Sequence, residues 1–180
     1  TAPAPAEEVD PRYRAVVIGY GPVGRTLVRL LRENGISPTV IELNVETVRQ
    51  LRAEGMAAVY GDASHPDTLK AAGVPHAATL FLAASGLTRA EEVVRAAREL
   101  NPGIRVVARS AYLREREELR RAGADEVYAG EGEVALALAE SVLRELGATA
   151  EQIDRERERV RAELFGAPEP PKPADVPLTE

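Results

Sequence analysis

The sequence predicts an α/β fold of the doubly wound, Rossmann-like kind, with a parallel six-stranded sheet in the order 3-2-1-4-5-6 and a C-terminal helical extension. Two observations support this prediction. Between Arg14 and Gly147, short apolar runs of β type alternate with segments of helical period, which is typical of βαβ units. The first run also passes through Gly19-x-Gly21-x-x-Gly24 directly into a helix-period segment, as nucleotide-binding turns do.

Each predicted element follows from its own pattern of apolar residues. Short apolar runs predict strands over residues 15–18, 39–42, 57–60, 78–83, 105–108 and 126–128. Helical spacing predicts helices over residues 23–34, 45–54, 66–72, 89–100, 111–122, 133–146 and 151–165. Glycines that suit helix C-termini follow five of these helices, namely Gly35, Gly55, Gly73, Gly123 and Gly147. Right-handed crossovers between the strands then give the doubly wound order.

The length and the two ends of the chain indicate one domain with tails. The 180 residues suit a single hydrophobic core. We expect a linker over residues 1–13, a nucleotide-binding domain over residues 14–147, a helical extension over residues 148–166 and a disordered tail over residues 167–180, because both ends are rich in proline. The chain starts at Thr1 after no methionine, so we expect a fragment whose N-terminal part precedes the linker.

Composition narrows the class of function. The formal net charge of -6 and the lack of a basic, aromatic-interleaved patch argue against nucleic acid as a partner. The chain has no cysteine, hence no disulfide or thiolate metal site, and no apolar run approaches the ~18 residues of a membrane span, so we expect it to be soluble. His65 and His76 each lie beside a proline without a second ligand, so we predict no metal site and no catalytic residue.

The three glycines of the first turn each meet a separate physical need. Gly19 permits the tight turn out of the strand, Gly21 lets backbone N–H groups approach a phosphate, and Gly24 allows close packing of the helix on the sheet. The helix N-terminus that follows offers unpaired N–H groups and partial positive charge to an anion. The turn therefore predicts a phosphate site.

A lone acid, Glu42, ends the second predicted strand about 20 residues beyond the glycine motif. A carboxylate there accepts hydrogen bonds from both ribose hydroxyls and repels a 2′-phosphate. The residues that follow, Leu43, Asn44 and Val45, supply no cation to offset that repulsion. NADP is therefore disfavoured as a ligand.

The remaining candidates lie at the carboxyl ends of other strands, which converge on one crevice. Strand 3 ends in Gly-Asp62-Ala63, where Asp62 either forms an Asx turn before the next helix or lies beside an adenine. Ala83 and Ser85 after strand 4 leave room for a nucleotide, or simply form a small-residue turn. Arg109 at the end of strand 5 either reaches a phosphate or is a solvated surface arginine.

Five segments together resemble a known family. They are Val-Ile-Gly-Tyr-Gly-Pro-Val-Gly at 17–24, Val-Ile-Glu-Leu-Asn at 40–44, Tyr-Gly-Asp-Ala at 60–63, Leu-Lys-Ala-Ala-Gly at 69–73 and Val-Val-Ala-Arg at 106–109. The chain from about residue 14 to 147 resembles the RCK N-terminal domain, also called the TrkA-N or KTN domain. The likeness is strongest to the cytoplasmic regulatory domain of Kef-type monovalent cation:proton antiporters.

The resemblance implies a function and a ligand set. Domains of this family bind AMP, ADP, ATP or NAD(H), form homodimers through the Rossmann domain and pass the ligand state to a membrane-embedded cation transporter or channel. The resemblance implies phosphate contacts from the glycine turn, a ribose contact from Glu42 and an adenine-side contact from Asp62. The full predicted site is Gly19, Gly21, Pro22, Val23, Gly24, Glu42, Leu43, Asp62, Ala63, Ala83, Ser85 and Arg109.

One departure from the family pattern concerns Pro22. Many relatives carry an arginine at this position that holds terminal phosphates, whereas proline supplies neither a cation nor an N–H group. We therefore expect AMP, ADP or NAD(H) to bind in preference to ATP.

The leading hypothesis is a nucleotide-binding regulatory domain at the cytoplasmic face of the cell membrane that gates a K+ or Na+:proton antiporter. An alternative is a separate regulatory subunit of a Trk- or Ktr-like K+ uptake system. An NAD-dependent oxidoreductase is less favoured, because too few residues remain for a substrate domain and no acid–base set lies near the crevice. We therefore expect a protein that is not an enzyme. The predicted helix over residues 151–165 either extends the dimer surface or covers the sheet.

Overall fold

The computed structural model describes residues 10–84 and 86–166. Most of the predicted linker, all of the predicted disordered tail, and Ser85 lie outside these ranges. The chain divides into two compact units, Thr1–Gly130 and Glu131–Glu180. The first contains the sheet, and the second contains two long helices. The predicted domain boundary after residue 147 concerns function and stays a prediction.

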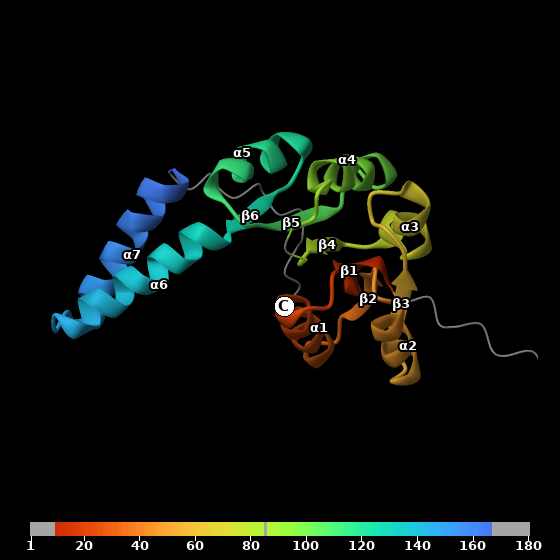
Figure 1. The fold of residues 1–180 in the computed structure, drawn as a ribbon, viewed down its shortest axis with the longest axis horizontal. Helices are drawn as coiled ribbons and strands as arrows, with labels where there is room; N and C mark the ends of the chain where they lie inside the picture. The colour runs from red at the N-terminus through yellow and green to blue at the C-terminus, as the bar shows by residue number, and fades with distance from the viewer. Residues whose placement is uncertain (1–9, 85, 167–180) are drawn as a thin grey trace, which may run out of the picture. The chain divides into compact units, whose positions relative to one another are not determined.

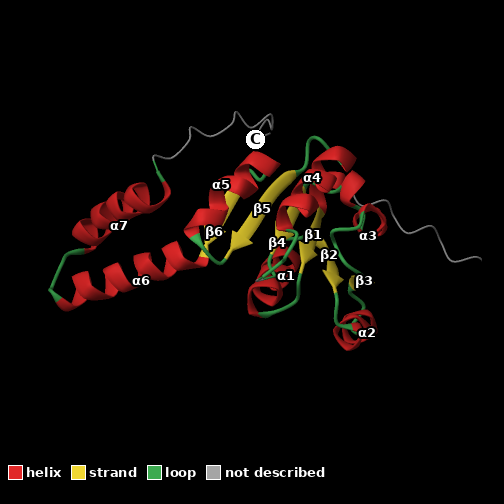
Figure 2. Ribbon diagram, turned by 45° about the horizontal axis from the view of Figure 1, so that its top comes forward, coloured by secondary structure: helices red, strands yellow, loops and turns green. Residues whose placement is uncertain are grey.

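A six-stranded parallel sheet forms the first unit, in the order β3-β2-β1-β4-β5-β6, which confirms the predicted topology (Figures 1 and 2). The strands are β1 (Arg14–Ile18), β2 (Ser37–Glu42), β3 (Ala57–Tyr60), β4 (Thr79–Leu82), β5 (Arg105–Ser110) and β6 (Glu126–Ala129). The α-helices are α1 (Pro22–Glu33), α2 (Val45–Ala53), α3 (Pro66–Ala71), α4 (Ala90–Leu100), α5 (Leu113–Ala122), α6 (Gly130–Glu145) and α7 (Ala150–Phe165). Two short 3-10 helices, η1 (Pro11–Tyr13) and η2 (Val74–His76), complete the described elements.

Helices cover both faces of the sheet, as the doubly wound fold requires. Figure 1 shows α3, α4 and α5 on one side of the strands and α1 and α2 on the other. The pleat of β1 sends Val16 and Ile18 into the core under α3–α5, and Val17 into the core under α1 and α2. The strands are apolar on both sides because both sides are buried. The loops that follow the carboxyl ends of the strands, where the sequence predicts the nucleotide site, are therefore held by a sheet that is packed on both faces.

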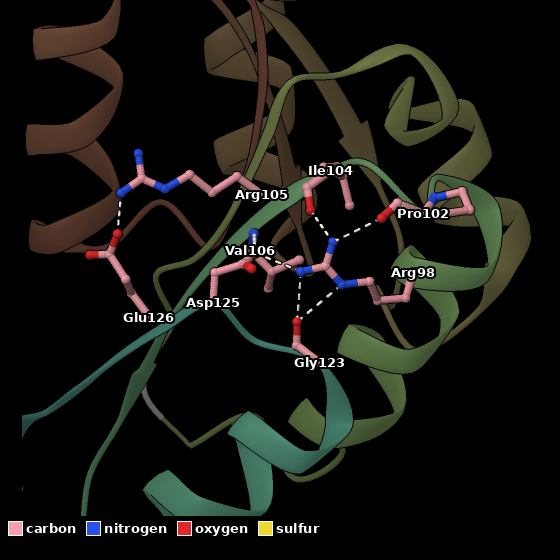
Figure 3. A network of polar contacts seen from close by, with 8 residues as sticks. All are labelled: Arg98, Pro102, Ile104, Arg105, Val106, Gly123, Asp125 and Glu126. Atoms are coloured by element: carbon pink, nitrogen blue, oxygen red, sulfur yellow. Dashed lines mark hydrogen bonds and ion pairs between the residues drawn. The ribbon is translucent and has the colours of Figure 1, made fainter. Parts of the chain in front are cut away.

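An arginine ties the second half of this unit together (Figure 3). Arg98 of α4 donates to the Gly123 carbonyl oxygen at 2.8 Å, to the Ile104 carbonyl oxygen and to the Asp125 carboxylate at 2.5 Å. The same carboxylate accepts the Val106 N–H at 2.8 Å. Because the Arg98 and Asp125 side chains are about three-quarters buried, these bonds satisfy polar groups that water reaches poorly. The network fixes α4, β5 and the start of β6 relative to one another.

The predicted helix ends agree with the structure, because all five terminating glycines have positive φ, between 74° and 118°. One start differs. Helix α6 begins at Gly130, directly after β6, and not at residue 133. The first turn of α6 contains Gly130 and Gly132, of which Gly132 is buried.

Helices α6 and α7 form the second unit. Ion pairs join them, with Arg157 3.7 Å from Glu140 and Arg161 3.4 Å from Glu133. Thr149 caps the start of α7 by accepting the Gln152 N–H. No helix in the described ranges is both long and apolar enough to span a membrane.

Candidate nucleotide-binding site

The glycine turn joins the carboxyl end of β1 to α1 at the centre of the sheet. Gly19 has φ +94°, and a Cβ there would lie 2.7 Å from the Cβ of Ala84. A Cβ on Gly24 would lie 2.0 Å from the Gly19 carbonyl oxygen, so the first turn of α1 rests directly on the backbone of the loop. A Cβ on Gly21 would meet nothing within 4 Å. The turn is therefore closed at its ends and open at its middle glycine.

The open side of the turn is where α1 begins. Gly21 is the N-cap residue, and no side chain of the described residues caps the helix there. Pro22 at the first helical position has no N–H group, so the N–H groups of Val23 and Gly24 remain the donors of the first turn. These donors and the helix dipole suit a phosphate above Gly21.

Glu42 lies beside this turn and helps to hold it. One carboxylate oxygen accepts the Tyr20 N–H at 2.9 Å, across 22 residues of sequence. The other accepts the N–H groups of Leu43 at 2.8 Å and Asn44 at 3.1 Å. The predicted ribose acid is thus next to the phosphate turn, and its carboxylate points at the backbone between β1 and α1. Leu43 is 63% exposed beside it and offers an apolar surface to a base.

Strands β4 and β5 close the other side of the crevice. The N–H groups of Ala83 and Ala84 both donate to the Ile18 carbonyl oxygen at 2.9 Å, which fixes the end of β4 against the glycine turn. Arg109 donates to the Ala83 carbonyl oxygen at 3.4 Å. The structure therefore brings Ala83 and Arg109 to the switch point between β1 and β4. Ser85 lies outside the described residues.

The loop after β3 has a clear local structure. An Asp62 carboxylate oxygen accepts the Ser64 N–H at 2.8 Å, as in an Asx turn. This hydrogen bond is the main reason that the pKa of Asp62 lies below its ordinary value, and the positive charge of Arg89 adds to the shift. Ala63 is buried in the core, so its side chain is not available to a ligand. The contact with an adenine stays a prediction.

Sequence reasoning missed one contact of the site. Tyr20 supplies the N–H that Glu42 accepts, which is a backbone role for which its residue type carries no chemical signal. Ala84, one of the small residues expected at the end of β4, packs on Gly19. Only the position of Tyr20 between two motif glycines pointed to this place.

The parallel sheet, the glycine turn at its switch point and the acid at the end of β2 define a Rossmann-type domain. Comparison with known proteins gives the family: the family described as "TrkA-N domain" matches residues 15–130. The chain belongs to this family, which confirms the resemblance seen in the sequence.

Individual relatives agree. The glutathione-regulated potassium-efflux system protein KefC of Cronobacter sakazakii is 30% identical over 161 residues, which are 89% of this chain and 25% of that protein. The crystal structure of the TrkA-N domain of the Escherichia coli inner membrane protein ybaL is 35% identical with a TM-score of 0.68, and the match covers 72% of this chain and 96% of that one. The Shewanella denitrificans Kef C-terminal domain in its AMP-bound form is 25% identical with a TM-score of 0.72, covering 84% and 95%. The chain thus spans about a quarter of the length of such transporters.

Proposed function

We propose that this chain is a nucleotide-sensing regulatory domain of a monovalent cation:proton antiporter, located at the cytoplasmic face of the membrane. The observation that carries the proposal is the open space above Gly21 at the N-terminus of α1, in the same turn whose Tyr20 N–H is bonded to the Glu42 carboxylate. The similarity to potassium-efflux proteins supports the transporter part, and the AMP-bound state of the similar Kef domain supports the ligand class.

The proposed ligand is AMP, ADP or NAD(H). Its phosphate accepts hydrogen bonds from the N–H groups of Val23 and Gly24, and its ribose hydroxyls donate to Glu42. An ionised carboxylate offers about four acceptor positions, and backbone N–H groups use three of those on Glu42. One ribose hydroxyl takes the remaining position, and the second replaces a backbone N–H group. Pro22 adds no cation for further phosphates, so ATP is less favoured. The carboxylate also disfavours NADP by repelling a 2′-phosphate.

The proposed action is regulatory and not catalytic. A ligand controls a transporter only by binding more tightly to one of two arrangements of the regulatory domains. Couplings between such sites are typically about 1–3 kcal/mol, which changes an open-to-closed ratio by roughly 5- to 150-fold. The turn that holds the phosphate is bonded directly to β2 and β4. Ligand binding therefore acts on a rigid part of the sheet.

We propose that the domain works as a homodimer, and a stripe on α6 supports this. Val134, Leu138 and Val142 recur every four residues on α6, and Leu146 continues the series; each is more than half exposed. A continuous apolar stripe of this kind marks an interaction surface. A two-fold interface brings the same surface of two identical chains together. A second copy of this chain is therefore the simplest partner for the stripe.

The dimer proposal makes a direct prediction. A Leu138→Lys variant is expected to sediment as a monomer at concentrations where the parent chain is dimeric, since it places a charge in the centre of the stripe. Ala162→Lys adds the same charge at an exposed position of α7 outside the stripe and should leave the dimer intact. A Leu138→Lys dimer as stable as the parent would contradict the assignment.

The ligand proposal is tested by thermal-shift titration with AMP, ADP, ATP, NAD, NADH and NADP in parallel. A ligand that binds only the folded state at 100 times its Kd stabilises by about 2.7 kcal/mol. We expect AMP, ADP or NAD(H) to raise the melting temperature more than ATP, and NADP to have the smallest effect. An absence of any shift, or an NADP shift equal to that of NAD, would contradict the proposal.

A further inference from the structure

A groove that starts at Tyr20 and extends away from the glycine turn lies between α1 and the chain that joins α2 to β3. Its volume is about 440 Å³, and it is open to solvent. The lining includes Tyr20, Arg25, Val28, Arg29, Arg32 and Met56. We refer to it as the arginine groove.

The three arginines of the groove share one face of α1. Their spacing of four and then three residues places them on successive helical turns, over about 10 Å of helix axis. Arg29 is paired with Glu33 at 3.1 Å. Within the described part of the chain, Arg25 and Arg32 form no ion pair and no hydrogen bond through their side chains. Two guanidinium groups thus face the groove with their donors uncommitted.

The floor of the groove is apolar, although its walls are charged. Val28 is only 2% exposed at the base, and Met56 and Tyr20 are half-buried beside it. At the far end of the groove, the Glu54 carboxylate accepts a hydrogen bond from the Gln50 side-chain amide at 3.0 Å. With three arginines and two glutamates, the groove carries a charge of +1 in a chain whose net charge is -6. The groove is therefore slightly positive in a chain that is negative overall.

The groove is distinct from the proposed nucleotide site. It extends along α1 from Arg25 to Glu33, away from the helix N-terminus and towards the start of β3. The two sites meet only at Tyr20, whose side chain lines the groove and whose backbone N–H is bonded to Glu42.

We propose that the arginine groove binds a small organic or inorganic anion with at least two negative charges, carried by carboxylate or phosphate groups. Two uncommitted guanidinium groups on adjacent turns match two anionic groups a few ångströms apart, and arginine forms bidentate bonds with either chemistry. The apolar floor accepts the body of the ligand. A single charge engages one arginine only and binds weakly against salt and water. The site takes a second effector, independent of the nucleotide.

The test is a titration of the 15N-labelled chain with citrate, inorganic pyrophosphate and acetate at 0.15 M NaCl, a salt concentration at which exposed charges are screened beyond about 8 Å. Citrate probes carboxylate chemistry, pyrophosphate probes phosphate chemistry, and acetate is the single-charge comparison. We expect citrate or pyrophosphate to shift the amides of residues 20–33 and 54–56 in a saturable way, with acetate at least tenfold weaker.

Variants in which glutamine replaces arginine, and so removes the positive charge, make the test specific. Arg25→Gln/Arg32→Gln is expected to weaken the binding of the divalent anion at least tenfold and to leave AMP binding within twofold. Arg95→Gln/Arg155→Gln removes the same charge from exposed positions of α4 and α7 and should leave both ligands unaffected. The inference is overturned if neither multivalent anion saturates, if Arg25→Gln/Arg32→Gln binds them as the parent does, or if the shifts occur only at residues 19–24 and 42–44. If the parent chain does not bind AMP, the nucleotide proposal is refuted instead.

Discussion

Two glycine-to-alanine variants separate folding from ligand binding at the same turn. In Gly24→Ala, the new methyl carbon would lie 2.0 Å from the Gly19 carbonyl oxygen. The atom it strikes is backbone, so the strain is not relieved by a change of rotamer, and α1 must move by more than 1 Å relative to the loop, since ordinary contacts begin at about 3.4 Å. We expect a loss of about 3 kcal/mol, the upper end for overpacked positions, and a fall in Tm of roughly 6–12 °C for a chain of this size.

Gly21→Ala has the opposite profile. Its methyl carbon meets nothing within 4 Å, and φ is -74°, which alanine adopts without strain. The poorer N-cap and the stiffer unfolded chain nearly cancel, so stability should change by less than about 1 kcal/mol. The methyl group occupies the space proposed for the phosphate, so AMP affinity is expected to fall at least tenfold.

Urea denaturation and calorimetric titration with AMP together test this pair. The matched substitution is the same in both variants, so general effects of alanine cancel in the comparison. The reasoning is refuted if Gly21→Ala binds AMP as the parent chain does, or if Gly24→Ala unfolds at the parent's urea midpoint.

Three further predictions concern charged groups. Glu42→Ala should reduce AMP affinity at least tenfold by calorimetry while costing only about 1 kcal/mol of stability, because water replaces the carboxylate as acceptor for half-exposed N–H groups; equal affinity would remove Glu42 from the site. Arg98→Ala should lower the free energy of unfolding in urea by about 2–4 kcal/mol, since it leaves the Asp125 carboxylate and three carbonyl groups poorly satisfied. Arg98→Lys should lose less than half of that, and equal costs of the two variants would contradict the network. The hydrogen bond from the Arg105 side chain, with a second from Tyr128, holds the pKa of Glu126 below its ordinary 4.5. The stabilisation by ionised Glu126 is therefore present above about pH 4.5 and is lost as pH falls through the lower pKa of the folded state. Glu126→Gln should differ from the parent in unfolding free energy near pH 6 and converge with it in strong acid, and a constant difference would contradict the pKa shift.

The fold followed from the sequence because local and long-range signals agree. The apolar runs of β1 and β4 predict buried strands, and the glycines after the helices predict helix C-termini. The order of the elements could therefore be predicted from the sequence alone. Right-handed crossovers then left one arrangement. The start of α6 at Gly130 was missed because glycine has a low intrinsic helix propensity, yet Gly130 and Gly132 both lie in the first turn of the helix.

The site was only partly accessible to sequence reasoning. Gly19, Gly24 and Glu42 carry a spacing that has a physical meaning, so their neighbourhood was predicted before their contacts were known. The bond from the Tyr20 N–H to Glu42 is a backbone contact and has no side-chain signature. The arginine groove is formed by two segments of the chain. The arginines lie on α1, whereas Met56 in the floor belongs to a segment more than twenty residues further along the sequence. Periodicity within one helix does not reveal such a pairing.

The central claim is that a nucleotide lies between the first turn of α1 and the end of β2. A crystal structure of the chain with AMP tests it most directly. The account predicts the phosphate against the N–H groups of Val23 and Gly24, and the ribose hydroxyls on the Glu42 carboxylate. AMP bound elsewhere on the chain, or bound with its ribose away from Glu42, would contradict it.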